Sequence, residues 1–343
     1  MTRTDPPTDP QSVPSAPAER KDARTVTIAE DRDGQRIDNF LLGYLKGAPR
    51  SLVYKLLRSG QVRLNGGRVK AERKLEAGDQ VRIPPVRLEE PGDKGAPARG
   101  LLEAMEASIL FEDPWLLAIN KPAGVASHGG SGIAFGAIET LRALRPKESL
   151  ELVHRLDRDT SGLLLVSRKR SALTELQALM REEGGRTGGI RKRYLALLTG
   201  RMPDGVMSVD APLHVGLRQG GERHVQVVTN ANSGAGKASM SHFRVLERRG
   251  GQSYCEVRID TGRTHQIRVH AQHIGHPVAG DDKYGDAAVN KRLRDQVGLK
   301  RMFLHASTLE FTLTGAAAGG AKRPYLLNAP LSPELIDVLD RLG

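Results

Sequence analysis

The sequence predicts an α+β fold in two parts: a small α/β module, followed by a larger domain built around a mixed or antiparallel sheet. Three observations favour this fold. The chain has 343 residues, enough for one large domain and a smaller one. A Gly- and Pro-rich stretch of mixed charge, residues 88–107, separates two patterned regions. The strands and helices expected after it do not alternate as they would in a doubly wound parallel sheet.

The first 24 residues differ from the rest of the chain. They contain five prolines and almost no large apolar residues, so they cannot bury enough surface to become ordered. We therefore expect a disordered tail over residues 1–24, an α/β module over residues 25–87, a linker over residues 88–107 and the larger domain over residues 108–343.

Residues 25–87 carry the patterns of a compact module. Apolar residues recur at helical spacing in residues 37–45 and again in residues 52–57, after a break at Pro49. The segment QVRLNGGRV predicts a strand, an Asn-Gly turn and a second strand, and AGDQVRIP predicts a closing strand.

The excess positive charge of the chain is concentrated in this module. The formal net charge is +12, and residues 32–87 hold thirteen Lys/Arg against five Asp/Glu. A basic protein favours polyanions, because binding releases counterions from phosphates. A solvated helix face explains any single basic residue, but the whole set predicts a phosphate-binding face. Its candidate residues are Arg36, Arg50, Lys55 and Arg58.

Composition also argues against several classes of protein. No apolar run approaches the roughly eighteen residues of a membrane helix, and no signal segment opens the chain, so we expect a soluble, cytoplasmic protein. The single cysteine, Cys255, excludes an internal disulfide framework and is expected in the core of a strand. The sequence has no GxxxxGKS/T, GxGxxG or GxSxG motif, so ATP and dinucleotide chemistry have no support.

In the larger domain, strands are expected in SILFEDPWLLAINKPAG, LVHRLD, GLLLVSR, RKRYLALLTG and SYCEVRID, and helices in SALTELQALMREE and HQIRVHAQHIG. The segment HRLDRDTSG, residues 154–162, sets Asp157 and Asp159 among arginines. At the end of a strand, Asp157 would be rigidly held yet face a cleft, and nearby guanidinium groups would keep it ionised as a nucleophile or base. A turn cap paired with surface arginines explains the same residues equally well. A glycosidase pair is disfavoured, because acids two residues apart cannot flank one bond.

Two other segments offer functional side chains. Residues 261–277 contain Arg263 and Arg268, either of which could reach Asp157 and form an ion pair. The same segment holds His265, His270, His273 and His276. No Asp or Glu lies among these histidines and no HExxH pattern is present, so no metal site is predicted. Tyr194 follows three basic residues, and is either an ordinary strand aromatic or a ring that stacks on a nucleobase.

The motifs HRLDRDTSGLLLVSR, KRYLAL, TGRTHQIRVH and GHPVAGDDKYG together resemble those of the RluA-type pseudouridine synthases, and occur in that family's order. AINKPAGVASHGG and KRMFLHASTLEF resemble segments that open and close the catalytic domain, so the resemblance covers residues 108–335. Residues 34–87 resemble the small S4-type RNA-binding fold. This two-part order is most similar to the family members that modify 23S ribosomal RNA of the large subunit.

The resemblance implies roles for several residues. Asp157 matches the family's essential aspartate, and Tyr194 its active-site tyrosine. Arg268 matches the arginine that pairs with the aspartate, with Arg263 as the second choice. Arg155 matches the arginine that enters the space left by a flipped-out base. The predicted catalytic residues are therefore Asp157, Arg268 and Tyr194, and the predicted RNA-binding residues are Arg155, Arg263, Arg36, Arg50, Lys55 and Arg58.

The resemblance also implies the reaction and the partners. Pseudouridylation is an isomerisation, so no cofactor and no metal are expected. The expected partner is large-subunit ribosomal RNA, with transfer RNA as an alternative substrate, and a monomer is the default because the sequence carries no oligomer signal. A non-catalytic RNA-binding or ribosome-assembly factor would use the same basic module, but it would gain nothing from a carboxylate among its phosphate contacts. No contact is predicted for the glycine-rich residues 216–236.

Overall fold

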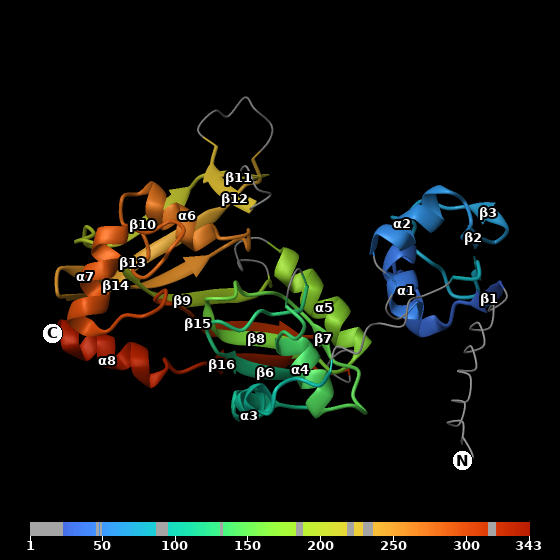
Figure 1. Ribbon diagram of the computed structural model, residues 1–343, viewed down its shortest axis with the longest axis horizontal. Helices are drawn as coiled ribbons and strands as arrows, with labels where there is room; N and C mark the ends of the chain where they lie inside the picture. Colours follow the sequence, from blue (N-terminus) through green and yellow to red (C-terminus); the bar gives the residue numbers. More distant parts are fainter. Residues whose placement is uncertain are drawn as a thin grey trace, which may run out of the picture. The chain divides into compact units, whose positions relative to one another are not determined.

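The computed structural model describes residues 23–45, 48, 50–86, 95–130, 133–182, 188–217, 223–228, 236–314 and 320–343 (Figure 1). The chain divides into two compact units, Met1–Gly95 and Ala96–Gly343. Residues 1–22 of the predicted disordered tail lie outside the described residues, and the first strand, β1 (Arg24–Thr27), begins at the last residue of that tail.

The smaller unit is a four-stranded antiparallel sheet with two α-helices, in the strand order β1-β4-β2-β3. Its other elements are η1 (Glu30–Arg32), α1 (Ile37–Tyr44), α2 (Arg50–Arg58), β2 (Arg63–Leu64), β3 (Gly67–Arg68) and β4 (Gln80–Ile83). Asn65 and Gly66 form the predicted two-residue turn, and both have positive φ (49° and 78°), as a hairpin of this length favours. The apolar faces of both helices pack with Val81 and Ile83 of the sheet in one core.

The larger unit is built around a ten-stranded sheet with the main strand order β10-β13-β14-β9-β15-β8-β6-β5. The strands are β5 (Ile109–Glu112), β6 (Leu116–Lys121), β7 (Glu151–Leu152), β8 (Ser161–Ser167), β9 (Arg191–Leu198), β10 (Val206–Asp210), β13 (Met240–Arg249), β14 (Gln252–Ile259), β15 (Leu304–Leu313) and β16 (Arg323–Asn328). The helices are α3 (Arg99–Ala107), α4 (Ala137–Leu144), α5 (Arg170–Arg181), α6 (Gln266–His273), α7 (Ala287–Val297) and α8 (Pro333–Leu342). A separate two-stranded sheet pairs β11 (Leu213–Leu217) with β12 (Arg223–Val227).

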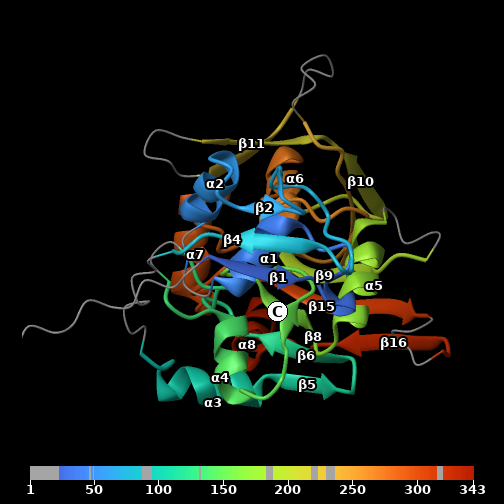
Figure 2. The same cartoon turned by 90° about the vertical axis from the view of Figure 1, so that its right-hand side faces the viewer.

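The middle strands are covered on both faces. Alternate residues of β6 and β8 pack with α3 and α4 on one side and with α5 on the other. Strands buried on both faces need continuous apolar runs rather than alternation, which is why the sequence reads LLAI in β6 and GLLLV in β8. The succession β5, β6, β8, β15 and β9 can be followed upward in Figure 2.

One strand pair makes the sheet mixed and fixes where the turn before β8 lies. All the other pairs are antiparallel, but β8 runs parallel to β15, with Ser161 opposite His305 and Gly162 opposite Ala306. Gly162 has a φ of 110°, and a Cβ there would lie 2.2 Å from the Ala306 carbonyl oxygen. The start of β8, directly after the HRLDRDT segment, is therefore pressed against β15 as only glycine allows.

The strand predicted in LVHRLD is shorter than expected. β7 ends at Leu152, and the chain leaves the sheet over the next residues. Val153 still donates its N–H to the Leu165 carbonyl, at 3.1 Å, but the Leu165 N–H donates to Nε2 of His154, at 3.0 Å. The imidazole thus replaces a backbone carbonyl of the ladder, which releases the chain toward Asp157.

The predicted linker, residues 88–107, ends in a helix. Residues 87–94 lie outside the described residues, and α3 occupies Arg99–Ala107. Met105 on this helix is fully buried against Leu117 and Ile119 of β6. The Gly- and Pro-rich composition hid a short amphipathic segment, GLLEAMEA, that packs on the larger unit.

Cys255 lies on β14 and is fully buried, as predicted for a core residue. Among the described residues, no helix combines the length and the apolar character needed to cross a membrane.

His305 should make the fold sensitive to acid. It is buried on β15, where Nε2 donates to the Ala329 carbonyl (3.1 Å) and Nδ1 accepts from the Ser161 hydroxyl (2.9 Å). Burial lowers the pKa of His305 to about 4. Between the unfolded pKa, about 6.5, and this value the unfolded chain binds a proton that the folded chain does not. The free energy of unfolding should therefore fall, by up to about 3 kcal/mol, as the pH drops through this window.

Denaturant unfolding between pH 7 and pH 4 measures this dependence. His154, whose pKa burial also lowers to about 4, contributes in the same direction. In His305→Gln, the free energy of unfolding should decline less over this pH range, because the contribution of one buried histidine is removed. An unchanged slope in that variant would contradict the prediction.

Candidate active site

A cleft of about 880 Å³ lies in the larger unit, where the turn before β8 meets β9, the end of β14 and the loop before α6. Its walls include four residues that the sequence singled out: Arg155, Asp157, Tyr194 and Arg263. Arg268 lines an adjoining hollow, also beside Asp157. The fold thus gathers in one place side chains from segments more than 100 positions apart.

Asp157 opens a turn, which Thr160 closes by donating its N–H to the Asp157 carbonyl at 3.2 Å. The Asp157 side chain is 27% exposed and lines the cleft. Asp159 instead lies 3.3 Å from Arg158 Nε, with both side chains largely exposed. The turn therefore separates two acids that look alike in the sequence, and only Asp157 faces the cleft.

The peptide groups on either side of Asp157 are held by the segment that follows β6. The Ser127 hydroxyl donates to the Leu156 carbonyl (2.8 Å) and accepts the Leu156 N–H (2.9 Å). Gly124 donates its N–H to the Arg158 carbonyl at 2.8 Å. Asp157 is thus bracketed between two fixed neighbours, which limits the movement of its carboxylate.

Lys121 completes this support. Its side chain is fully buried, and Nζ donates to the carbonyls of Pro122 and Val125 (2.8 Å each) and of Arg158 (3.1 Å). Three acceptors match the three N–H groups of an ammonium. Burial lowers the pKa of Lys121 to about 7, while the two carboxylates of the turn act in the opposite direction.

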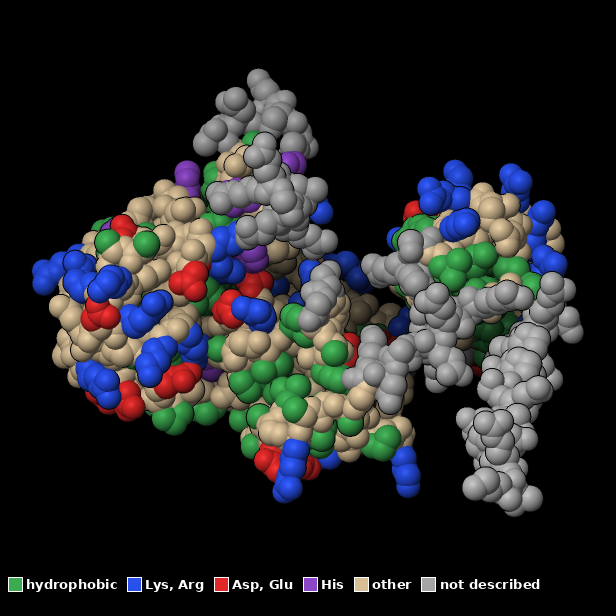
Figure 3. All heavy atoms as spheres, in the orientation of Figure 1, with side chains coloured by type: hydrophobic (Ala, Val, Ile, Leu, Met, Phe, Trp, Pro, Cys, Tyr) green, Lys and Arg blue, Asp and Glu red, His purple; other side chains and the backbone are tan. Residues whose placement is uncertain are grey.

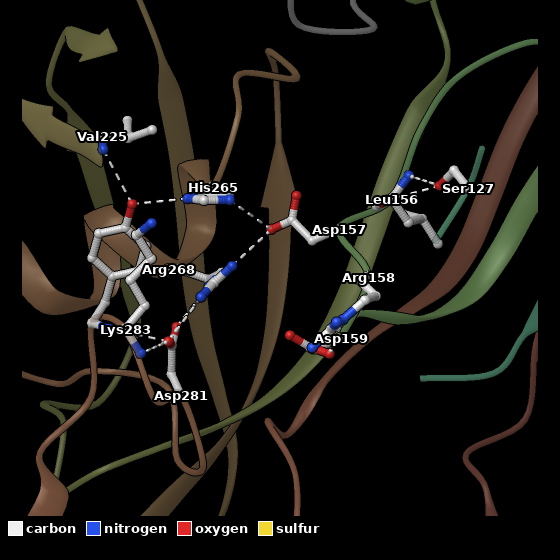
Figure 4. A network of polar contacts seen from close by, with 11 residues as sticks. Ser127, Leu156, Asp157, Arg158, Asp159, Val225, His265, Arg268, Asp281 and Lys283 are labelled. Carbon is white, nitrogen blue, oxygen red and sulfur yellow. Dashed lines mark hydrogen bonds and ion pairs between the residues drawn. The ribbon is translucent and has the colours of Figure 1, made fainter. Parts of the chain in front are cut away.

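Arg268 joins Asp157 to a second, buried carboxylate (Figure 4). Its Nη1 donates to Oδ2 of Asp157 at 3.1 Å, and its Nε and Nη2 donate to Asp281 at 2.7 and 2.9 Å. The Asp281 side chain is fully buried, and it also accepts the backbone N–H groups of Lys283 and Tyr284. A buried charge needs such a complete set of partners.

Arg268 and Asp281 both remain charged although they are buried. Burial alone would lower the pKa of Arg268 and raise that of Asp281. The hydrogen bonds and opposite charges outweigh burial, so the pKa of Arg268 is raised and that of Asp281 is lowered. The Tyr284 ring, 5.0 Å from the guanidinium carbon, adds a cation–π contact.

The two oxygens of the Asp157 carboxylate have different surroundings. Arg268 contacts Oδ2, and Nε2 of His265 lies 3.8 Å from the same oxygen. Within the described part of the chain, no group donates a hydrogen bond to Oδ1. Oδ1 is therefore the oxygen left to approach a substrate.

β9 contributes two side chains to the cleft. Lys192 and Tyr194 are two positions apart, so they share one face of the strand. Burial, and then the charge of Asp157, raise the pKa of Tyr194, which keeps its phenol protonated. Lys192 is only 5% exposed, and burial lowers its pKa. In the sequence, Lys192 is one member of the basic run before Tyr194 and carries no separate signal.

The two predicted RNA-binding arginines of this unit lie at the cleft. Arg155 is exposed, with Nη1 3.5 Å from Nε2 of His128. Arg263 donates from Nε to the Ala238 carbonyl at 2.9 Å. Of the two arginines considered as partners of Asp157, the one whose guanidinium contacts it is Arg268.

The predicted RNA-binding residues of the smaller unit differ in their exposure and in their partners. Arg36 makes a two-pronged pair with Asp38, at 3.1 and 2.7 Å, so its guanidinium is already oriented. Lys55 and Arg58 are exposed and three positions apart, on one side of α2. Arg50 begins α2, and its side chain is outside the described part. Figure 3 shows basic side chains gathered over this unit where α2, β2 and β3 lie.

The clustered histidines have separate partners. His270 is buried and donates from Nε2 to the Ala211 carbonyl at 2.9 Å. His276 Nδ1 lies 2.9 Å from the Thr199 carbonyl oxygen. In the described residues, no three or more His, Cys, Asp or Glu side chains are arranged to hold a metal ion.

Four residues around Asp157 were not singled out from the sequence: Lys121, Ser127, Asp281 and Tyr284. Asp281 and Tyr284 belong to GDDKYG, a motif that contributes to the family resemblance. The resemblance implies no role for either residue. Lys121 could have been noticed, because a lysine at the end of an apolar strand needs buried acceptors. Ser127 carries no local signal, since only the fold brings it to Leu156.

Two family models match the chain. The RNA pseudouridylate synthase model matches residues 116–273, and the S4 domain model matches residues 35–81. The chain is 48% identical over 327 residues to "Ribosomal large subunit pseudouridine synthase C" of Salmonella typhi, covering 94% of this chain and 98% of the relative. It is 49% identical over 292 residues to the protein of the same name from Haemophilus influenzae, covering 84% and 87%.

Solved structures with the same fold include two human proteins. Human RNA Pseudouridylate Synthase Domain Containing 1 is 26% identical with a TM-score of 0.52, over 65% of this chain and 82% of that one. Human RNA Pseudouridylate Synthase Domain Containing 4 is 24% identical with a TM-score of 0.55, over 71% and 95%. The second likeness concerns the fold alone.

Removing the guanidinium of Arg268 should destabilise the larger unit strongly. Arg268→Met leaves Asp281 as an unpaired buried charge, which we expect to cost about 3–5 kcal/mol of unfolding free energy. The double variant Arg268→Met with Asp281→Asn should recover much of this loss, because the unpaired charge is gone. Chemical denaturation measures both.

Arg191→Met is the matched control, because Arg191 and Glu310 form an exposed pair at 2.8 Å. Its effect should stay below about 1 kcal/mol. If Arg268→Met were as mild as this control, the importance of the buried pair would be refuted.

Proposed function

Because this chain belongs to the RNA pseudouridylate synthase family, we propose that it isomerises uridines of large-subunit ribosomal RNA to pseudouridine. The family resemblance of its motifs is confirmed by the family models and by the relatives at 48–49% identity. The α+β architecture with an S4 domain in front is confirmed as well. The proposed substrate is supported by the names of those relatives, which refer to the large ribosomal subunit.

The single observation that carries the proposal is the setting of Asp157. Its carboxylate faces a cleft, with Oδ2 held by Arg268 and Oδ1 left for a substrate. A carboxylate repels RNA phosphates, so it contributes nothing to a site that only binds RNA. Its rigid support from Ser127 and Lys121 is the arrangement that a reacting group requires.

The reaction needs no co-reactant. The N1–C1′ bond breaks, the uracil ring turns, and C5 bonds to C1′. C5 then loses its proton and N1 gains one, so the composition is unchanged. Oδ1 of Asp157 would attack C1′ to give a covalent intermediate, or remove the 2′ proton to give a glycal, and the proposal includes both routes.

The other residues would prepare the nucleotide and the carboxylate. Arg268 would orient the Asp157 carboxylate through its hydrogen bond to Oδ2. Tyr194, a protonated phenol beside Asp157, would stack on or hydrogen-bond to the turned-out base. Arg155 would fill the space that the base leaves, and Arg263 would contact phosphates at the rim. Extrusion costs a few kcal/mol, which these contacts offset.

The smaller unit would supply affinity rather than chemistry. Its exposed Lys55 and Arg58, with Arg36 and Arg50, are proposed to contact RNA phosphates. We also propose a monomer, because Asp157, Arg268 and Tyr194 all come from one chain and need no second copy. A cytoplasmic location follows from the proposed ribosomal substrate.

The proposal is tested by mapping pseudouridines in large-subunit ribosomal RNA from cells that lack this gene. Specific pseudouridines should be missing and should return with the wild-type gene. Asp157→Asn should not restore them, because activity should fall at least about 10³-fold when the reacting carboxylate is removed.

Asp159→Asn is the matched control: the same change, two residues away, on an exposed acid. It should restore the map. An unchanged map in cells lacking the gene would contradict the proposed substrate and direct the search to transfer RNA. Restoration by Asp157→Asn would contradict the proposed chemistry.

The basic face of α2 should act through phosphate contacts. Lys55→Ala with Arg58→Ala should weaken RNA binding, and should reduce the slope of log K against log salt by up to about 2, one unit for each phosphate that is no longer neutralised. Binding titrations at several salt concentrations measure this slope. Arg99→Ala with Lys291→Ala removes the same net charge from exposed sites of the larger unit. Equal slopes in the two double variants would refute a specific role for α2.

A further inference from the structure

His265 has a backbone conformation that residues other than glycine rarely adopt. It precedes α6 with φ 53° and ψ 20°, in the left-handed region where a Cβ is crowded. Among the described residues other than glycine, only Asn65 also has positive φ, and Asn65 lies in an Asn-Gly hairpin turn that favours it. No hairpin explains His265. Residues held in such conformations cluster at functional sites, which directs attention to its side chain.

This conformation places the His265 ring between Tyr284 and Asp157 (Figure 4). Nδ1 lies 2.8 Å from the Tyr284 hydroxyl oxygen, and Nε2 lies 3.8 Å from Oδ2 of Asp157. The ring is also packed against the Tyr284 ring, 5.5 Å away at 70°. Both ring nitrogens therefore face a specific polar atom.

The polar partners of the two ring nitrogens favour one tautomer of His265. The Val225 N–H can only donate, and it donates to the Tyr284 oxygen at 3.2 Å. In the tautomer that pairs every polar atom, the Tyr284 hydroxyl donates to Nδ1 of His265, and Nε2 carries its N–H toward the Asp157 carboxylate. Burial lowers the pKa of His265, so the imidazole is neutral near pH 7. Its one N–H is therefore on Nε2, the nitrogen that faces Asp157.

We propose that His265 is a positioning residue, whose Nε2–H supports Oδ2 of Asp157 beside Arg268 and so directs Oδ1 at the ribose of the target uridine. This rests on the proposed function of the chain. The distance of 3.8 Å exceeds a hydrogen bond, so the proposal requires this contact to tighten when the nucleotide fills the cleft. Two donors on one oxygen orient a carboxylate better than one, because they restrict its rotation about the Cβ–Cγ bond.

The arrangement also gives the β11–β12 sheet a role. Val225 lies on β12, inside the glycine-rich region for which the sequence predicted no contact. Its N–H fixes the direction of the Tyr284 hydroxyl, and the hydroxyl fixes the tautomer of His265. The position of β12 is thereby linked to Asp157 through two side chains.

Two substitutions separate the two ring nitrogens. In His265→Gln, the side-chain amide can place its N–H₂ where Nε2 lies. In His265→Asn, the amide reaches only the position of Nδ1, although asparagine tolerates the left-handed backbone well. With a large-subunit ribosomal RNA fragment as substrate, kcat and KM of pseudouridine formation are measured for both variants and the wild type, together with thermal unfolding.

We expect kcat to fall about 100-fold in His265→Asn, with KM nearly unchanged, because a misplaced reacting group slows the chemical step. His265→Gln should stay within about fivefold of the wild type, since the donor to Oδ2 is kept. Thermal unfolding should differ little between the variants.

Equal activity of the two variants, or losses in both that follow a lower unfolding temperature, would overturn the positioning role and leave the proposed function intact. A wild-type protein that forms no pseudouridine on this RNA in the same assay would overturn the proposed function, and this inference with it.

Discussion

The buried ion pair between Arg268 and Asp281 is the interaction on which the geometry of the cleft depends. Two charges taken out of water are tolerated only with a full set of partners, and here the two-pronged contact and two backbone N–H groups provide it. The pair leaves Nη1 of Arg268 available for a further hydrogen bond, and that nitrogen donates to Asp157 from the other half of the sheet. The two halves meet at the parallel pairing of β8 with β15, where Gly162 allows close approach.

Asp157 is held from two directions by different means. On its own side, Ser127 and Lys121 fix the flanking peptide groups, so the backbone cannot turn. On the opposite side, Arg268 contacts one carboxylate oxygen, and His265 lies next to the same oxygen. Because the backbone and the side chain are fixed separately, little would have to reorganise when a substrate binds, which is the preorganisation that the proposed role of Asp157 requires.

The sequence predicts those parts of the fold and site that depend on neighbouring residues better than those that depend on residues far apart in the chain. Local patterns were sufficient for the Asn-Gly hairpin and for the apolar runs of β6 and β8. The acid of HRLDRDTSG was found because a carboxylate among arginines is conspicuous, but choosing Arg268 over Arg263 required a family resemblance. Spacing along the chain does not say which guanidinium crosses 111 positions to reach Asp157.

The features that the sequence did not predict depend on contacts between distant parts of the chain or on the backbone itself. The end of β7 depends on the His154 ring replacing a carbonyl, and no propensity encodes that exchange. α3 was hidden by the Gly and Pro residues that precede it, although Met105 is fully buried. Lys121 and Ser127 act through backbone carbonyls and N–H groups, which look the same in every residue, so only the folded chain shows what they hold.

The charges of the cleft explain how RNA could approach an acid. Arg268 is shared by two carboxylates, so the three groups together carry one net negative charge. Asp281 takes the two shorter contacts, at 2.7 and 2.9 Å, and Asp157 receives one at 3.1 Å. Because Asp281 takes two of the three guanidinium contacts, Asp157 receives a single hydrogen bond rather than a two-pronged pair. The phosphates that such a charge would repel are attracted instead by the cations that line the same cleft, namely Arg155, Arg158, Arg181, Lys192 and Arg263. Basic walls would therefore attract the polymer, while the shared arginine holds one carboxylate in place among them.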